Sequence, residues 1–230
     1  MNTLKKILIW SIPHGLYKYY KGTTNFQKDI DNILKMPRYT NGIINLPSHK
    51  AFEFVDNMSF YAQYIDFFHN EIYYFRISEN KNPLIIDAGA NIGLAIVYWK
   101  SIYPNAKIIG FEPDSDVFKV LKKNVSRYQD VEIHNYGLYH SETSLPFMSE
   151  GADSGSLIFG NDSTRTPNKV IDVKKLSPFL ENKVALLKID IEGAEYEVLK
   201  ESSSMLKNVE KIFVEYHSFI GQEQVLPELL

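Results

Sequence analysis

The chain has 230 residues, enough for one well-cored domain with a small appendage, and 44% of them are hydrophobic, so a globular core is expected rather than disorder. The formal charge is -3 and no dense Lys/Arg cluster is present, so the chain is not expected to bind a nucleic acid. There is no cysteine, which excludes disulfides, thiolate metal sites and a cysteine nucleophile, and which fits a cytoplasmic location.

The N-terminal stretch imitates a signal peptide. Its apolar run, Ile7 to Ile12, is short and precedes Pro13 without a small-residue cleavage site. Residues 1–22 combine four lysines with several aromatic residues, so peripheral contact with a membrane surface is one interpretation. We favour the other interpretation, in which this arm packs against its own protein.

A polar, turn-rich stretch at Ser78 to Pro83 divides the chain into two regions. We expect residues 1–80 to form an N-terminal arm and cap region, and residues 81–230 to form the main domain. The aromatic-rich stretch Met58 to Phe75 carries more apolar surface than an isolated small core would bury stably. It is therefore predicted to pack on the main domain and to cover part of it.

Within residues 81–230, short apolar runs alternate with segments of helical periodicity, which is typical of βαβ units. The predicted fold class is α/β with a doubly wound, mainly parallel sheet. Strands are expected at 84–86, 108–111, 131–133, 184–189 and 212–217, and helices at 94–102, 113–125 and 192–206. The stretch Ser141 to Thr166, rich in Ser, Gly, Asp and Thr, is expected to be a long functional or mobile loop.

A glycine-rich turn follows the first expected strand and reads Asp87-x-Gly89-x-Asn91-x-Gly93, which departs from the G-x-G-x-x-G spacing of dinucleotide loops. Glycines at such a turn let the backbone approach a ligand, and the following helix offers free N–H groups. An aspartate at the head of the turn would repel a pyrophosphate but suits a sulfonium or an ammonium group. S-adenosylmethionine carries both groups and no phosphate, so the turn favours it over a nicotinamide cofactor.

The second expected strand leads into Glu112 and Pro113. A carboxylate at this position can accept hydrogen bonds from both hydroxyls of a ribose, a device that nicotinamide sites share. Glu112 alone does not separate the two cofactors. Together with Asp87, in order and at strand ends, it indicates a cofactor site rather than a turn former and a helix-flanking acid.

More acidic residues follow the fourth expected strand, where Asp190, Glu192 and Glu195 surround Gly193. Ligands of an open doubly wound sheet bind outside the carboxyl ends of the strands, where the winding reverses. We therefore expect Asp190 to face the same crevice as Asp87. Glu195 suits a simpler role, because acids at a helix N-terminus complement the helix dipole.

The last expected strand alternates with period two, which puts Phe213, Glu215 and His217 on one face. His217 stands at the end of this strand and is expected beside the same crevice. With Glu215 on the same face, we interpret His217 as a site residue rather than a surface histidine.

Five segments carry a family resemblance: IIDAGANIG, GFEPD, VEIHNYGL, LLKIDIEGAEYEVLK and VEYH. In order and context they resemble the FkbM-type family of S-adenosylmethionine-dependent methyltransferases, over about Phe60 to His217. The resemblance implies a Rossmann-like class I methyltransferase fold and O-methylation of a sugar, polysaccharide or natural-product hydroxyl. In that fold a further helix and an antiparallel hairpin normally finish the sheet. The sequence ends just after Pro227, so this hairpin is expected to be absent and a strand edge to be uncovered.

The resemblance also implies which residues hold S-adenosylmethionine. The glycine-rich turn would line the methionine and ribose side, Glu112 would hold the ribose hydroxyls, and the segment after the third strand would pass near the adenine. The predicted cofactor-binding residues are Asp87, Gly89, Ala90, Asn91, Gly93, Glu112, Pro113, Asn135 and Gly137.

Methyl transfer from a sulfonium needs no general acid, because the leaving group is a neutral thioether. A hydroxyl acceptor must lose its proton, so a base or a metal ion is expected near it. We expect His217 or Asp190 to be the base, with Glu215 as a further catalytic candidate. In the alternative, Asp190, Glu192 and Glu215 bind Mg²⁺ on the hydroxyls of the acceptor.

The stretch Glu150 to Arg165 is predicted to close over the acceptor, with Asp153, Ser154 and Ser156 as its contributors, although an ordinary surface loop is an alternative. The acceptor itself is expected to be a small molecule or a glycan. Two other functions remain open at this stage: a nicotinamide-dependent Rossmann oxidoreductase, and a non-catalytic cofactor-binding module of a polysaccharide-assembly system.

Overall fold

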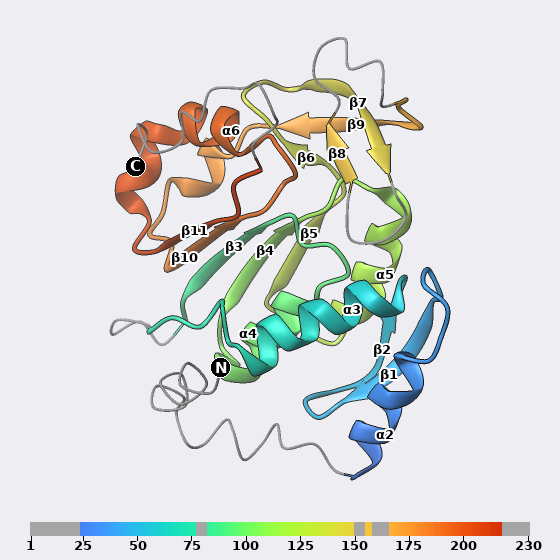
Figure 1. Ribbon diagram of the computed structural model, residues 1–230. Helices are drawn as coiled ribbons and strands as arrows, with labels where there is room; N and C mark the ends of the chain where they lie inside the picture. The colour runs from blue at the N-terminus through green and yellow to red at the C-terminus, as the bar shows by residue number, and fades with distance from the viewer. Residues whose placement is uncertain (1–23, 77–81, 150–154, 158–165, 218–230) are drawn as a thin grey trace, which may run out of the picture.

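The centre of the molecule is a five-stranded, fully parallel sheet with the strand order β11-β10-β3-β4-β5 (Figure 1). The structure is a computed structural model that describes residues 24–76, 82–149, 155–157 and 166–217. The strands are β3 (Leu84–Ala88), β4 (Lys107–Phe111), β5 (Val131–His134), β10 (Leu186–Ile189) and β11 (Ile212–Val214). From β3 the chain winds outward through β4 to β5, then returns to β10 and β11 on the other side. The predicted doubly wound α/β fold is confirmed.

Helices cover both faces of this sheet (Figure 1). Successive residues of a strand point to opposite faces, so Ile85 joins the hydrophobic cluster with α4 and α5, whereas Ile86 joins the cluster with α6. These helices are α4 (Leu94–Ile102), α5 (Ser115–Val125) and α6 (Glu195–Ser202), and the 3₁₀ helices η4 (Ser177–Leu180) and η5 (Ser203–Asn208) lie beside α6. Burial on both faces explains why the strands are continuous apolar runs.

The N-terminal region packs on the same core. It contains α2 (Thr24–Ile33), the hairpin of β1 (Gly42–Leu46) and β2 (His49–Phe54), α3 (Asn57–Tyr64) and the π-helix η3 (Ile65–His69). The ring of Phe68 meets that of Tyr98 on α4 edge to face at 5.3 Å, and Trp99 donates its indole N–H to the carbonyl oxygen of Tyr73 at 3.2 Å. The stretch 58–75 thus packs on α4 of the main domain, as expected.

A second, four-stranded sheet has the order β6-β9-β7-β8. Its strands are β6 (Gly137–Leu138), β7 (Thr143–Ser149), β8 (Gly155–Leu157) and β9 (Lys169–Lys174). The prediction of one long loop over 141–166 is therefore wrong where β7 and β8 form. The Ser-, Gly-, Asp- and Thr-rich composition of the whole stretch resembled a loop, but within β7 Leu145 and Phe147 are more buried than the residues between and before them, and antiparallel pairing with β9 satisfies the backbone.

Two element boundaries also differ from expectation. The helix expected from Glu192 begins only at Glu195, because Glu192 and Gly193 have φ angles of 55° and 107°, outside the helical range. β11 ends at Val214, so Glu215 and His217 follow the strand instead of sharing a face within it.

Some predictions fall outside the described residues. These are the arm over residues 1–22, the C-terminal residues after 217 that bear on the hairpin, and most of the stretch 150–165. Among the helices of the described part, none has the length and apolar character needed to cross a membrane.

Candidate functional site

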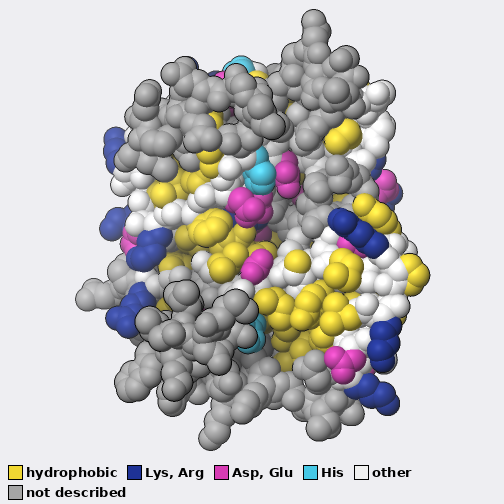
Figure 2. Space-filling view, viewed as in Figure 1, with side chains coloured by type: hydrophobic (Ala, Val, Ile, Leu, Met, Phe, Trp, Pro, Cys, Tyr) yellow, Lys and Arg dark blue, Asp and Glu magenta, His cyan; other side chains and the backbone are white. Residues whose placement is uncertain are grey.

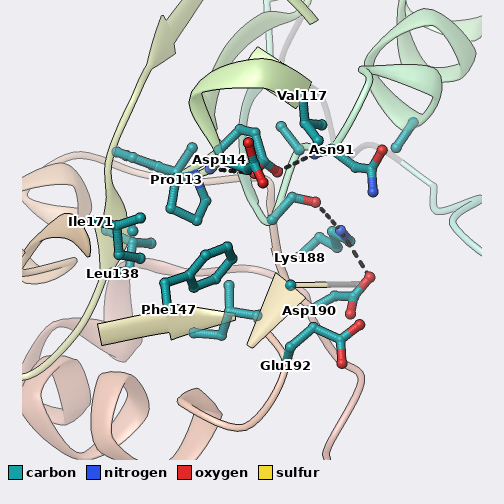
Figure 3. A pocket seen from close by; sticks show the side chains of 18 of the residues that line it. Asn91, Pro113, Asp114, Val117, Leu138, Phe147, Ile171, Lys188, Asp190 and Glu192 are labelled. Atoms are coloured by element: carbon teal, nitrogen blue, oxygen red, sulfur yellow. Dashed lines mark hydrogen bonds and ion pairs between the residues drawn. The ribbon is translucent and has the colours of Figure 1, made fainter. Parts of the chain in front are cut away.

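A cavity opens at the carboxyl ends of β3, β4 and β10, where the winding of the sheet reverses (Figure 3). The loops after these strands form one wall. The second sheet contributes Phe147, Leu157 and Ile171, and the N-terminal region contributes Gln63 and Phe67. The space between the atoms is about 910 Å³, part of it open to solvent, which is within the range of small-molecule sites.

Most of the predicted cofactor-binding residues lie on this cavity. Its walls include Gly89, Ala90, Asn91, Glu112, Pro113 and Gly137. Asn135 is exposed and does not line the cavity, and its side-chain amide donates to the carbonyl oxygens of Glu112 at 2.9 Å and Pro113 at 3.2 Å. Asp87 and Gly93 do not line the cavity either. The structure thus brings the two strand-end motifs together, and three of the predicted residues lie outside the cavity lining.

The two glycines of the turn are required by the protein's own packing. Gly89 has a φ angle of 84°, and a Cβ atom there would lie 1.8 Å from the carbonyl oxygen of Asp190. Gly93 is the N-cap of α4 with a φ angle of 87°, and a Cβ atom there would lie 2.7 Å from Cδ1 of Leu121. Glycine at 89 therefore lets the loops after β3 and β10 touch, which draws two walls of the cavity together.

Glu112 presents a fixed carboxylate on the cavity wall. The side chain is buried, its Oε2 accepts the backbone N–H of Asn91, and its Oε1 accepts that of Asp114, each at 2.9 Å. Burial raises the pKa of Glu112 to about 7, against the lowering effect of these hydrogen bonds. Each oxygen keeps a second lone pair, so the carboxylate suits a ligand with two adjacent hydroxyls.

Lys188 is a site residue that the sequence interpretation missed. It is 3% exposed, and its Nζ donates to the carbonyl oxygen of Gly89 at 2.7 Å. The same Nζ lies 3.2 Å from Oδ2 of Asp190 and 3.3 Å from Oδ1 of Asp87, which is fully buried. Burial alone would lower the pKa of Lys188, but the two carboxylates outweigh it and hold the pKa above its usual value. The charge of Asp87 is thus met by a buried lysine rather than exposed to the cavity.

The signal for Lys188 was present in the sequence. A lysine inside the otherwise apolar strand β10 must find a charged partner when both faces of the sheet are covered. The partner is Asp87 at the aligned position of the neighbouring strand β3.

The loop after β10 is organised by Glu195. This carboxylate is fully buried, and its Oε1 accepts the N–H groups of Ile191 at 3.2 Å and Gly193 at 3.0 Å. The same oxygen lies 3.0 Å from Nδ1 of His217. Glu195 was expected to complement a helix dipole. The structure shows that it also holds the turn carrying Glu192 and orients His217.

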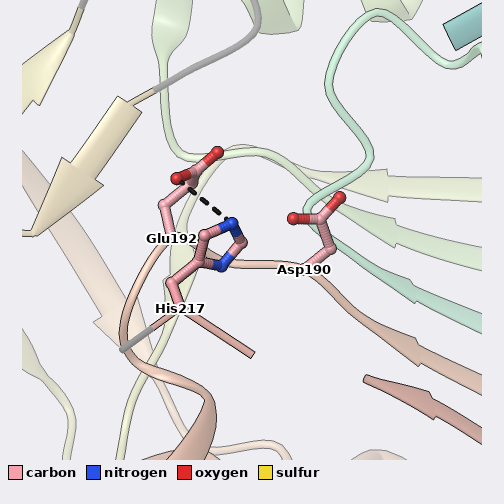
Figure 4. A group of neighbouring side chains, drawn as sticks. All are labelled: Asp190, Glu192 and His217. Carbon is pink, nitrogen blue, oxygen red and sulfur yellow. Dashed lines mark ion pairs between the residues drawn. The ribbon is translucent and has the colours of Figure 1, made fainter. Parts of the chain in front are cut away.

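Asp190, Glu192 and His217 form a cluster whose nearest nitrogen and oxygen atoms lie within 4.8 Å of one another (Figure 4). Asp190 and Glu192 line the cavity, whereas His217 lies behind Glu192, with its Nε2 3.6 Å from Oε2 of Glu192. The pKa of His217 is raised to about 9, first by the hydrogen bond to Glu195 and then by the nearby carboxylates, against the effect of burial. Glu215 stands apart: its side chain is 53% exposed and 4.0 Å from His217.

The second sheet is tied to the main domain at the N-terminus of α5. Lys169 on β9 forms ion pairs with Asp114 and, at 2.9 Å, with Asp116, and the hydroxyl of Ser149 donates to Asp114. Of the residues predicted to reach the acceptor, Ser156 is buried within β8, and Asp153 and Ser154 lie outside the described residues. On the face in Figure 2, acidic and histidine side chains lie beside a hydrophobic area near the middle.

The Methyltransferase FkbM domain model matches residues 87–230, and the chain belongs to this family of methyltransferases. This match confirms the resemblance inferred from the motifs. It also confirms the predicted class of enzyme, an S-adenosylmethionine-dependent methyltransferase. This membership decides against a nicotinamide-dependent oxidoreductase.

Three relatives and one solved structure illustrate the similarity. Methyltransferase 1 of Beauveria bassiana is 30% identical over 182 residues, 64% of this chain and 73% of that protein. Methyltransferase sdnD of Sordaria araneosa is 32% identical over 155 residues, which cover 52% of this chain and 60% of that protein. Hexuronic acid methyltransferase AglP of Haloferax volcanii is 27% identical over 147 residues, with a coverage of 63% of this chain and 60% of that protein. The crystal structure of Methyltransferase FkbM from Methylobacillus flagellatus KT has 18% identity and a TM-score of 0.46, over 61% of this chain and 34% of that one. The chain thus spans less than two thirds of the last three proteins.

Proposed function

We propose that this methyltransferase transfers the methyl group of S-adenosylmethionine to a hydroxyl oxygen of a sugar or natural product. The observation that carries the proposal is the carboxylate of Glu112, fixed by two backbone N–H groups on the wall of a cavity where the sheet reverses its winding. In this proposal Glu112 accepts hydrogen bonds from the ribose hydroxyls, as motif and geometry both favour. The bound cofactor supplies a methyl group activated by a sulfonium charge.

The charge of the cavity supports a cationic cofactor. Among the described residues, its ionisable lining consists of four acids, Glu112, Asp114, Asp190 and Glu192, and one base, Lys188; behind this lining Lys169 pairs with Asp114 and His217 lies 3.6 Å from Glu192. Lys188 is already paired with two carboxylates, so the wall near Asp190 and Glu192 stays acidic. Such a wall attracts a sulfonium and an ammonium group.

The same charge favours a neutral hydroxyl over a carboxylate as the methyl acceptor. The printed name of the Haloferax relative gives hexuronic acid as its substrate. An anionic acceptor beside Asp190 and Glu192 would meet like charge at short range, which costs binding free energy. A neutral sugar hydroxyl meets no such repulsion, but it needs a base to remove its proton, and the carboxylates supply candidates.

The predicted Mg²⁺ site fits this structure poorly. Glu215 lies outside the cluster, and His217 takes its place beside Asp190 and Glu192. Mg²⁺ prefers oxygen ligands, whereas this set includes an imidazole whose Nδ1 is already bonded to Glu195. We therefore assign no step of the reaction to a metal ion.

Two measurements test the proposal. Isothermal titration should show binding of S-adenosylmethionine and none of NAD, and Glu112→Gln should weaken that binding because its amide cannot accept two hydroxyls symmetrically. For the acceptor, cell glycans are incubated with the protein and S-adenosylmethionine labelled in the methyl group, and the product is treated with alkali. A methyl ether retains the label, as we expect. Release of the label as methanol would identify a carboxylate ester and refute hydroxyl methylation.

A further inference from the structure

We propose that Glu192 is the catalytic base that removes the proton of the acceptor hydroxyl, an inference that rests on the proposed hydroxyl methylation. The sequence pointed to His217 or Asp190 for this step and to Glu192 only as a metal ligand. The contacts of the three side chains favour a different division of roles.

His217 is held as a cation. Its Nδ1 lies 3.0 Å from the buried carboxylate of Glu195, and its Nε2 faces Glu192 at 3.6 Å and Glu215 at 4.0 Å. With carboxylates at both nitrogens, the ring is stabilised with a proton on each, and an imidazolium has no lone pair for an acceptor proton. His217 is therefore a positioning residue that orients Glu192, and Glu195 fixes the ring from the other side.

Asp190 is engaged by a different cation. Its Oδ2 lies 3.2 Å from Nζ of Lys188, a side chain that is 3% exposed and shared with Asp87. Proton uptake by Asp190 would remove one of the two carboxylates that compensate this buried charge, and uncompensated buried charge is costly. Asp190 is thus better suited to holding Lys188 in place than to accepting a proton.

Glu192 has the position of a base. Its side chain is 31% exposed, lines the cavity and stands on a turn that the N–H bonds to Glu195 hold in place. Its φ angle of 55° is unfavourable for a residue with a Cβ atom, and such strain concentrates at active sites. Burial raises the pKa of Glu192 to about 7; the charge of His217 lowers this pKa, and the nearby carboxylates of Asp190, Glu195 and Glu215 raise it further. A carboxylate with this pKa is matched to proton removal near neutral pH.

The chemical step balances with these groups alone. The acceptor oxygen forms a bond to the methyl carbon while the bond between that carbon and sulfur breaks, and the electron pair of the broken bond stays on sulfur. The hydroxyl proton passes to the carboxylate of Glu192, which is reionised by solvent at the open side of the cavity. His217 stabilises the ionised carboxylate between turnovers.

The experiment compares Glu192→Gln with Glu192→Asp and with a control, Glu197→Gln, in the full chain. Glu197 lies on α6, is 39% exposed at its side chain and pairs with His140, so it shares the charge of Glu192 but lies on the helix after the turn and does not line the cavity. Cell glycans and methyl-labelled S-adenosylmethionine serve as the probe, the rate of alkali-stable labelling at saturating cofactor is measured, and cofactor affinity is measured by titration.

We expect Glu192→Gln to lose roughly 10² to 10⁴-fold in rate at saturating cofactor, the usual contribution of a general base, and the titration separates this loss from any weaker cofactor binding. Glu192→Asp should recover part of the rate, and Glu197→Gln should match the wild type. A Glu192→Gln variant that labels glycans at the wild-type rate overturns the assignment. If the unmodified chain produces no alkali-stable label, hydroxyl methylation itself fails and the role of Glu192 fails with it.

Discussion

The contact between Gly89 and the loop after β10 makes a sharp prediction for Gly89→Ala. The new Cβ atom would lie 1.8 Å from the carbonyl oxygen of Asp190, whereas ordinary contact begins at 3.4 Å, so the two strand ends must separate by about 1.6 Å. A misplacement of about 1 Å in a catalytic site can cost on the order of 100-fold in rate. We therefore expect Gly89→Ala to lose at least about 100-fold in kcat/KM and to bind S-adenosylmethionine weakly.

Gly93→Ala is the matched control. Gly93 has nearly the same φ angle, 87° against 84°, so both variants share the cost of a left-handed alanine, about 1–2 kcal/mol. The Cβ atom at 93 would meet Cδ1 of Leu121 at 2.7 Å and Cγ1 of Val125 at 3.1 Å, which are side-chain atoms, whereas the Cβ atom at 89 would meet backbone. For a chain of this size the shared cost lowers Tm by roughly 2–8 °C.

Thermal unfolding, cofactor titration and methyl transfer are measured for both variants. The reasoning requires a much larger loss of cofactor affinity and rate at position 89 than at position 93, beyond the difference in Tm. Equal losses would show that only the backbone conformation matters and that the contact with Asp190 does not shape the site.

Two further predictions concern buried charges. Lys188→Met leaves Asp87 buried without its cation, so urea unfolding should show that the free energy of unfolding falls by about 3–5 kcal/mol. Adding Asp87→Asn in the same chain should restore part of this free energy. If the double variant is as unstable as Lys188→Met alone, the pairing is contradicted. Burial and, secondarily, Arg127 lower the pKa of His49 from 6.5 to about 4, so its contribution to stability is present above pH 6.5 and is lost as the pH falls toward 4. Between pH 8 and pH 5, this effect lowers the free energy of unfolding by about 2 kcal/mol. In urea unfolding, His49→Gln should not show this decrease. If the variant keeps the pH dependence of the wild type, the assignment to His49 is refuted.

Much of the site was predictable because local patterns determine it. Glycines after a strand, Glu112 at the end of the next strand and Asp190 at the end of a third all lie at carboxyl ends of parallel strands, and such ends meet at one edge of the sheet. The order of the motifs along the chain was therefore sufficient to bring Glu112 and Asp190 to one cavity.

The second sheet was not predictable in the same way. β7 is a half-exposed strand, and its apolar residues gain a partner only when β9, more than twenty residues later, folds beside it. Pairing between distant strands depends on register and on the surface beneath, which composition does not record. The walls formed by Phe147, Leu157 and Ile171 were missed for this reason.

The sequence by itself determined the fold class, the family and the edge of the sheet where the site lies, because periodicity and strand-end motifs are local properties. The tertiary structure decided what each charge does there. Asp87 faces Lys188, His217 is enclosed by Glu195 and Glu192, and Glu192 lines the cavity from a turn that Glu195 holds in place. A charged side chain acquires its role from its neighbours within a few ångströms, and those neighbours come from strands far apart in the chain.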